Sequence, residues 1–258
     1  MGIALTGLTA LIDLYRRYGA FGSTLQVGRQ GIFIADNERV AADAAIVAGG
    51  LGNDLASIVG TDHFADEHLL PRFGAAPVIA ADASAYEGAA IVHDFNEPIP
   101  RNHHQQFDTI IEFGSLEHIF NVPVAIANMM AMLKVGGRIL HMWPANNWLG
   151  HGFYQLGPEL AFRIYQPENG FEFVSARLGV AGQWTDLVDQ GPDGIRNERG
   201  YTAGTADLAV IALKTAHVRP FRRWPQQGDY SHAWNRVTGR AAPASLQDGR
   251  GWRFWRRG

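Results

Sequence analysis

A stretch of apolar segments separated by turn-forming residues, in the middle of the chain, constrains the fold more than any other feature. It begins with the apolar run 109–111, continues as a helical pattern after Pro123, and resumes beyond Gly136 and Gly137 as a second apolar run over 138–143. Short apolar runs bounded by turn residues are typical of buried strands, and proline suits the first turn of a helix. The stretch therefore predicts a strand, a helix and a second, parallel strand.

Two apolar runs ahead of this stretch each end in an aspartate. The first is Pro77–Asp82, and the second covers 89–96 and contains Asp94. Ligands of open α/β sheets bind at the carboxyl ends of the strands, so both aspartates are candidate ligand contacts. The alternative is that each aspartate caps the turn after its strand. Tyr86, between the two runs, is placed either to stack on a ring or to pack.

The N-terminal segment predicts a helix, then a strand and a glycine turn. Apolar residues over 5–15 recur at helical spacing. After Gly19 and Gly22, the run from Ser23 leads to Gly28 and Gly31. In a dinucleotide-type fold such a turn lets the backbone approach a ligand at the N-terminus of a helix. An ordinary bend is the alternative.

The segment after this turn carries weaker patterns, with helices predicted over 40–47 and 63–72. His63, Glu67 and His68 would share one side of the second helix. Their spacing departs from the patterns of metal-binding helices, and no third ligand stands nearby. We therefore expect a solvated helix face here, and the sequence predicts no metal site.

A polar, glycine-rich loop follows the strand at 138–143 and precedes a helix predicted over 158–165. Amide, hydroxyl and imidazole groups gathered at the carboxyl end of a strand suit recognition of a polar substrate, while a plain connector is the alternative. Apolar runs over 171–175 and 206–216 predict two last strands that close the sheet edge as an antiparallel pair. The candidate substrate-binding residues of the loop are Asn146, Asn147, Tyr154 and Gln155.

Composition narrows the class of protein. The 258 residues carry a net charge of -3 and no cysteine, which excludes disulfides, thiolate zinc sites and cysteine nucleophiles. The charge argues against a partner that needs a strong positive field, such as nucleic acid or an anionic membrane. No apolar run approaches the roughly 20 residues that span a bilayer. We expect a soluble, cytoplasmic protein.

The C-terminal segment 217–258 differs from the rest in composition. It holds nine arginines, two aspartates and four tryptophans. Basic and aromatic side chains together can stack on nucleic acid, but no recognisable nucleic-acid module is present. We expect an extension that packs on the body or on a neighbouring subunit, which would make a homodimer possible.

The order of these parts resembles a class I S-adenosylmethionine-dependent methyltransferase. The resemblance is carried by the glycine turn, Asp82, Asp94, the run 107–118 and the run 133–139, and within the superfamily the chain is similar to a bacterial branch of methyltransferase-domain proteins. It implies a Rossmann-like, doubly wound α/β fold whose mostly parallel sheet has an antiparallel C-terminal edge and helices on both faces. It also implies one such domain over 1–216, with an insertion at about 32–76 and cap or loop elements at 144–204, followed by the extension.

The resemblance implies S-adenosylmethionine as the cofactor and a role for each matching position. The backbone at Gly28 would contact the methionine part, Asp82 the ribose hydroxyls, and Asp94 with Phe95 the adenine. The segment Glu112–Ser115 would line the sulfonium side. The expected cofactor-binding residues are Gly28, Arg29, Gly31, Asp82, Asp94, Phe95, Glu112, Gly114 and Ser115.

The glycine turn departs from the family pattern of an acidic residue and three glycines. Gln26 stands at the acidic position. Arg29 adds a cation that could bind the carboxylate of the methionine part through two parallel hydrogen bonds. Three functions are therefore weighed: methyl transfer to a small polar acceptor at oxygen or nitrogen, another reaction of the same cofactor such as aminocarboxypropyl transfer or cyclisation, and non-catalytic binding. His118 and His151 are the candidate bases, because histidine titrates near neutrality.

Overall fold

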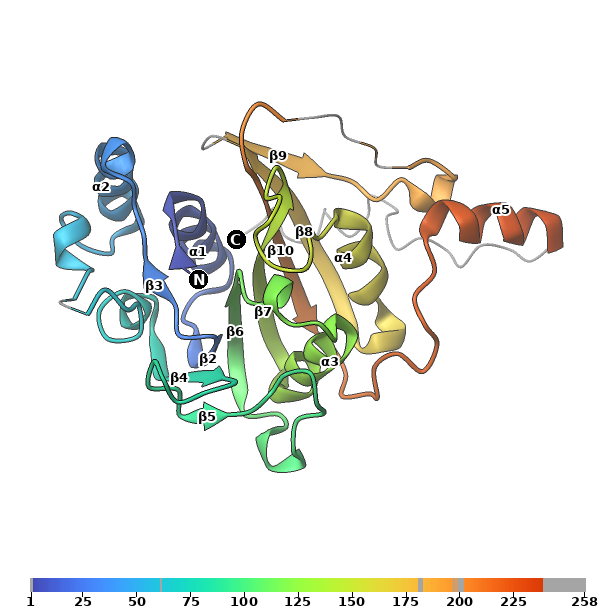
Figure 1. Ribbon diagram of the computed structural model, residues 1–258, viewed down its shortest axis with the longest axis horizontal. Helices are drawn as coiled ribbons and strands as arrows, with labels where there is room; N and C mark the ends of the chain where they lie inside the picture. Colours follow the sequence, from blue (N-terminus) through green and yellow to red (C-terminus); the bar gives the residue numbers. More distant parts are fainter. Residues whose placement is uncertain (1, 61, 181–182, 197, 199–201, 239–258) are drawn as a thin grey trace.

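The computed structural model describes residues 2–60, 62–180, 183–196, 198 and 202–238. Its centre is an eight-stranded sheet in the order β5-β4-β2-β6-β7-β10-β8-β9 (Figure 1). Pairing is parallel from β5 to β7 and antiparallel from β7 to β9. The strands are β2 (Gly22–Val27), β4 (Ala75–Asp82), β5 (Ile91–Val92), β6 (Phe107–Phe113), β7 (Leu133–Asn146), β8 (Phe171–Val180), β9 (Gln183–Leu187) and β10 (Ala206–Lys214).

Helices cover both faces of this sheet (Figure 1). Helices α1 and α2 share one apolar cluster with the sheet, and α3 and α4 share a second cluster on the opposite face. The predicted fold class, a doubly wound, mostly parallel α/β sheet with an antiparallel edge, is confirmed. The helices are α1 (Leu5–Tyr18), α2 (Arg39–Gly49), α3 (Val122–Met132), α4 (Pro158–Ile164) and α5 (Gly228–Thr238).

Successive residues of the central strands β6 and β7 pack alternately into the two apolar clusters. Ile110 and Ile139 face α3 and α4, whereas Ile111 and Leu140 face α1. Successive side chains of a strand point to opposite faces, so a strand that is buried on both sides is apolar over most of its length. This is why the two central strands were readable as continuous apolar runs.

The prediction of a helix over 63–72 is wrong. The segment forms turns and one short 3-10 helix, Leu70–Phe73. Pro71 has no N–H to continue a helical ladder, and His63 adopts a φ of 61°, outside the helical region. Leu70 and Phe73 are still fully buried, so the apolar spacing reflects burial without a regular helix.

The long polar segment between β8 and β10 contains a strand, β9, that the sequence does not predict. β9 forms the edge of the sheet, and its Trp184 packs under the Arg177 guanidinium, 5.1 Å from the ring centroid. Two further short strands, β1 (Gly2–Ile3) and β3 (Gly31–Ile32), pair parallel in a small separate sheet. Tyr201, in the segment between β8 and β10, lies outside the described residues.

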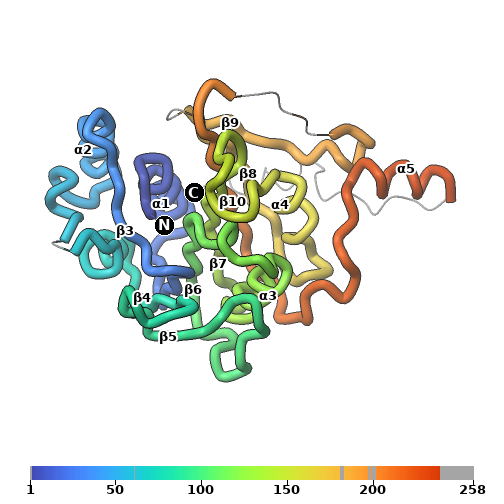
Figure 2. Tube along the Cα trace, viewed as in Figure 1, coloured from blue at the N-terminus to red at the C-terminus, as the bar shows by residue number. Residues whose placement is uncertain are grey.

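The C-terminal extension is described as far as residue 238, and the part from 239 to 258 lies outside the described residues. Helix α5 lies at the opposite end of the molecule from α2 (Figure 2). It is held by an ion pair between Arg196 and Asp229 at 2.6 Å and by a bond from the Gly228 N–H to Glu159 at 2.6 Å. Within the described ranges, no helix is long and apolar enough to cross a bilayer.

A buried lysine completes the C-terminal end of α3. Lys214 is 2% exposed, and its Nζ donates hydrogen bonds to the carbonyls of Met130 and Leu133 at 2.6 Å each. The last carbonyls of a helix have no partner within it. We expect Lys214→Met to lower the free energy of unfolding by about 1–3 kcal/mol, because two buried acceptors lose their donor. Urea denaturation measures the change.

Lys134 provides the matched control for this substitution. Its Nζ pairs with Asp108 at 2.9 Å, but both side chains are more than 40% exposed (41% and 44%). An exposed ion pair contributes about 0–1 kcal/mol. If Lys134→Met destabilises the protein as much as Lys214→Met, the loss does not come from the buried carbonyls.

Candidate functional site

The carboxyl ends of β4, β2 and β6 adjoin, and hydrogen bonds between their loops join them. The Gly28 N–H donates to the carbonyl of Ala81 at 2.8 Å, and the Ser115 hydroxyl donates to the carbonyl of Val27. The chain continues from β2 towards one edge of the sheet and from β6 towards the other. A reversal of this kind is the switch point at which open α/β sheets bind ligands. We call the ends of β2, β4, β5 and β6 the strand-end rim.

The two predicted aspartates lie on adjoining parts of this rim. The carbonyl of Asp82 accepts from the N–H of His93, at 2.8 Å, so the ends of β4 and β5 are tied together. Asp94 is exposed, and its Oδ1 accepts from the backbone and the side-chain amide of Asn96 at 2.9 and 2.8 Å. These bonds lower the pKa of Asp94. Its carboxylate is therefore an ionised acceptor.

The neighbours of the aspartates differ in what they present to solvent. Phe95 is 3% exposed and packs in the core, so only its backbone can meet a ligand. Tyr86 is 92% exposed, on the loop between β4 and β5. An aromatic side chain this exposed, on the loop that joins the strands of the two aspartates, offers a face on which a planar ring can stack.

The glycine turn does not lead into a helix. Gly28 has a φ of 70°, but the chain then enters β3, where Gly31 pairs with Gly2. Arg29 is held away from any ligand: its guanidinium pairs with Asp66 at 2.7 Å, contacts Asp62, and lies 4.0 Å from the centroid of the Phe64 ring. To bind the carboxylate of a ligand, Arg29 would have to give up these partners.

Glu112, predicted to line the cofactor, turns its carboxylate into the interior. One oxygen accepts from the N–H groups of Ser115 and Leu116 at 2.7 and 3.1 Å. The other lies 2.7 Å from Nδ1 of His141 and 2.9 Å from Nε1 of Trp143. All of these groups are buried. The carboxylate therefore shapes the turn after β6, and both of its oxygens are occupied by protein donors.

His141 continues this buried network to the hydroxyl of Tyr165. Burial raises the pKa of the Tyr165 phenol, with a smaller contribution from Glu112. The sequence does carry a signal for the network: Glu112 and His141 are ionisable residues inside apolar strands, and a buried ionisable group needs a partner. Their pairing shows once β6 and β7 are aligned, since the two residues are register partners.

The two predicted bases, His118 and His151, lie together, joined by a residue that the sequence did not single out. Glu117 is 1% exposed, and its Oε1 lies 3.8 Å from Nε2 of His118 and 3.6 Å from Nε2 of His151. The two imidazole rings are 5.2 Å apart and about half exposed. We call these three residues the glutamate–histidine cluster.

The environment of the cluster shifts its titration. Burial raises the pKa of Glu117 to about 8, and the neighbouring charge of Glu112 adds to the effect. Burial and His151 lower the pKa of His118, which keeps this imidazole neutral and able to accept a proton. The cluster borders the rim, because a Cβ at Gly114 would lie 3.0 Å from Oε1 of Glu117.

The side chains of the four predicted substrate ligands are hydrogen-bonded to other parts of the protein. Asn147 donates to the Thr202 and Gly204 carbonyls at 2.7 Å each, and Asn146 contacts the Thr202 hydroxyl. Tyr154 donates to the carbonyl of Phe120, and Gln155 accepts from the N–H of Trp148. These side chains shape the loop that carries His151. A direct role for them in binding a substrate stays a prediction.

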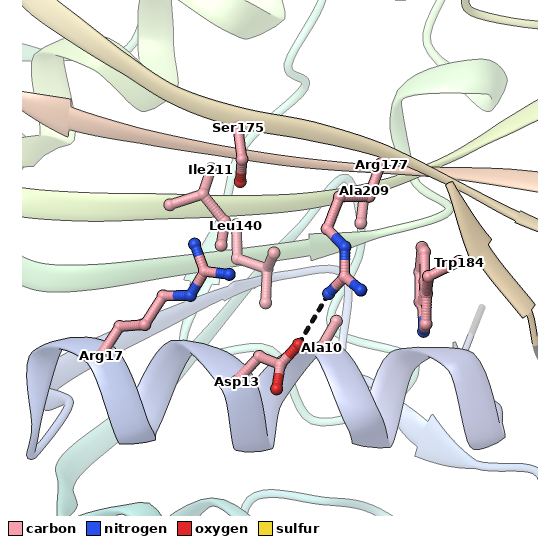
Figure 3. Close-up of a pocket in the computed structure, with 9 residues that line it drawn as sticks. All are labelled: Ala10, Asp13, Arg17, Leu140, Ser175, Arg177, Trp184, Ala209 and Ile211. Atoms are coloured by element: carbon pink, nitrogen blue, oxygen red, sulfur yellow. Dashed lines mark hydrogen bonds and ion pairs between the residues drawn. The ribbon is translucent and has the colours of Figure 1, made fainter. Parts of the chain in front are cut away.

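Two cavities of the described structure lie away from these groups. One of about 10 Å³, enough for a single water, lies between α1 and the sheet, where Arg177 pairs with Asp13 at 2.7 Å (Figure 3). A larger space of about 370 Å³ is lined by Ser23, Pro77 and Phe107, at the opposite, amino-terminal ends of the strands. Neither is lined by Gly28, Asp82 or Asp94. The site is therefore defined by its strand ends and polar groups.

Comparison with models of protein families and with curated proteins gives no match. Among solved structures, the chain is 17% identical to the 1,6-didemethyltoxoflavin-N1-methyltransferase of Burkholderia thailandensis, with 82% of this chain and 78% of that chain covered at a TM-score of 0.41. It is 14% identical to the N-methyltransferase NodS of Bradyrhizobium japonicum, with 81% and 86% covered at a TM-score of 0.43.

A third similar structure is the branched-chain polyamine synthase of Thermus thermophilus, at 14% identity and a TM-score of 0.39. The match covers 87% of this chain but only 60% of that one. The first two of these proteins are named as methyltransferases. Similarity at this level does not define a substrate or an activity.

Proposed function

We propose that the protein transfers a methyl group from S-adenosylmethionine to a small, polar acceptor. The observation that carries the proposal is the placement of Gly28, Asp82 and Asp94 on three adjoining strand ends at the switch point of a doubly wound sheet. The cofactor is the one that the sequence resemblance implies, and the groups of the rim suit its parts.

Each group of the rim matches one part of this cofactor. The carboxylate of Asp82 would accept from the ribose hydroxyls, and that of Asp94 from the exocyclic amine of adenine. Gly28 leaves its backbone open to the methionine part. Tyr86 is exposed enough to cover the adenine ring. Arg29 and Glu112 have no part in this arrangement, because both are saturated by protein partners.

The acceptor would approach from the side of the glutamate–histidine cluster. Methyl transfer is a displacement at an already activated carbon, so the protein chiefly positions the two reactants. A base is needed only where the acceptor must lose a proton. His118 is suited to that role by its lowered pKa and its exposure. His151 stands beside it, on a loop that hydrogen bonds hold in place.

A second chemistry, transfer of the aminocarboxypropyl arm, is favoured by one observation at the glycine turn. Gln26, at the position of the usual acidic residue, is fully buried, and its Oε1 accepts from the N–H of Gln30 at 3.2 Å. The turn thus offers no carboxylate to the ammonium of the methionine part. The by-product distinguishes the reactions: S-adenosylhomocysteine accompanies methyl transfer, and methylthioadenosine accompanies arm transfer.

Calorimetric titration tests the cofactor site. We expect S-adenosylmethionine and S-adenosylhomocysteine to bind, and Asp82→Asn to weaken both by about tenfold or more, since one lost charge-assisted hydrogen bond is equivalent to about 1.5–3 kcal/mol. The matched control is Glu87→Gln, an exposed acidic residue on the same loop. No heat with either ligand at millimolar concentration would overturn the cofactor proposal. If both variants weaken ligand binding equally, the effect of Asp82→Asn comes from the change in net charge and not from a lost contact with the ligand.

A further inference from the structure

We infer that Glu117, His118 and His151 form a binding site for a divalent transition-metal ion, with zinc as the ion that the ligand set suits best. One ligand atom from each residue lies within 4.8 Å of the others. Metal–ligand distances near 2.1 Å in a tetrahedron place ligand atoms about 3.4 Å apart. The distances of 3.6 and 3.8 Å from Oε1 of Glu117 to the two imidazole nitrogens are already close to this value.

The carboxylate at the centre of the cluster points independently to a cation. Glu117 is 1% exposed, and in the described part of the chain its Oε2 atom has no hydrogen-bond partner. Buried polar groups are otherwise almost always hydrogen-bonded, and buried charges are paired or bind metals. No lysine or arginine forms an ion pair with Glu117 among the described residues. A bound divalent ion would supply the partner that this carboxylate lacks.

The backbone holds the three ligands in place before any ion binds. His118 follows Glu117 in the short 3-10 helix Leu116–His118, directly after β6. The loop that carries His151 is fastened to this helix by the N–H of Phe153, which donates to the carbonyl of Glu117 at 2.7 Å. Trp148 packs against the His151 ring at 5.1 Å and donates to Asp207. The ion would therefore join two segments that already touch.

Two nitrogens and one oxygen leave a zinc ion with an open position. Three protein ligands and a fourth site for water or substrate characterise catalytic zinc centres, and the same ligand set also suits iron. The exposed halves of His118 and His151 face solvent, so the open position would be reached from outside. If the proposed methyl transfer holds, which this step requires, an acceptor oxygen bound there would release its proton to solvent water more readily, and the ion would then take the place of His118 as the group that promotes this deprotonation.

The test is a titration of the untagged, full-length protein with Co²⁺, a spectroscopic substitute for zinc. We expect one ion per chain, visible absorption bands of low coordination number, and loss of the bands on adding Zn²⁺. Glu117→Gln and His151→Gln should each weaken Co²⁺ binding by more than about tenfold, because even outer partners of metal ligands contribute 10–100-fold. His68→Gln, which changes an exposed histidine outside the cluster, should leave binding unchanged.

Absence of the bands at millimolar Co²⁺, or binding by Glu117→Gln equal to that of the unmodified protein, would overturn the inference. Circular dichroism of each variant shows whether it is folded, and His151→Gln, on an exposed loop, provides a second variant should Glu117→Gln fail to fold. S-adenosylmethionine titrations of the same samples separate the two proposals. If the protein binds S-adenosylmethionine but not Co²⁺, only the metal-site proposal is refuted. If it binds Co²⁺ but not S-adenosylmethionine, only the cofactor proposal is refuted.

Discussion

Replacing Glu112 with alanine is expected to lower the free energy of unfolding by about 3–5 kcal/mol, the range found when one partner of a buried ionic network is removed. Four donors lose their acceptor at once: the N–H groups of Ser115 and Leu116 and the ring nitrogens of His141 and Trp143. All are buried, so water cannot replace the carboxylate without opening the core. Chemical denaturation followed by circular dichroism measures the loss.

Two further variants make this expectation specific. Glu112→Gln keeps the shape and one acceptor but faces His141 and Trp143 with an NH₂ group, so it should be destabilised less than Glu112→Ala, yet clearly. Asp108→Asn changes a carboxylate of the same strand that is 44% exposed, and should cost less than about 1 kcal/mol. A Glu112→Ala protein as stable as Asp108→Asn would show that the network contributes little to the fold.

The periodic parts of this fold could be predicted from the sequence. The apolar runs that became β4, β6 and β7 have the length and bounding residues of buried strands. Helix α1 has buried leucines on one side and Arg16 and Arg17 in its last turn, where positive charge stabilises a helix end. In these elements local preference and tertiary burial agree.

Prediction failed where burial is not periodic. The segment 63–72 buries apolar side chains through turns around Pro71, and β9 alternates weakly because it is an edge strand. A two-residue strand such as β3 depends on its partner Gly2, far away in the sequence. Short-range patterns do not contain such information.

For the candidate site, the sequence predicts which strand ends adjoin but not how the side chains there are paired. The strand ends that carry Asp82 and Asp94 adjoin, as parallel strands require. By contrast, Arg29 takes its partners from Asp62 and Asp66, just before and within the helix expected over 63–72. Side-chain pairing across distant segments decides whether a charge is free for a ligand, and no local pattern reports it. For the same reason, no local pattern in the sequence shows that Glu117 lies beside both His118 and His151.

Gly152→Ala is expected to release the His151 loop from the 3-10 helix that carries Glu117. Gly152 has a φ of 81°, and a Cβ there would lie 2.7 Å from the carbonyl oxygen of Glu117 and 2.9 Å from its Cγ. Because the obstacle is backbone, the loop itself must move, which breaks the bond from the Phe153 N–H to the same carbonyl. Amide hydrogen exchange at Phe153 should accelerate by about tenfold or more, equivalent to roughly 1.4 kcal/mol.

Gly150→Ala separates this steric effect from backbone strain. Gly150 has a φ of 83°, so alanine is disfavoured there to a similar extent, yet nothing lies within 4 Å of the added Cβ. Exchange at Phe153 should therefore stay slow in Gly150→Ala. Equal acceleration in both variants would mean that the loop responds to strain alone. If only Gly152→Ala exchanges faster and also binds Co²⁺ more weakly, then contact between the loop and Glu117 is what holds His151 beside the carboxylate.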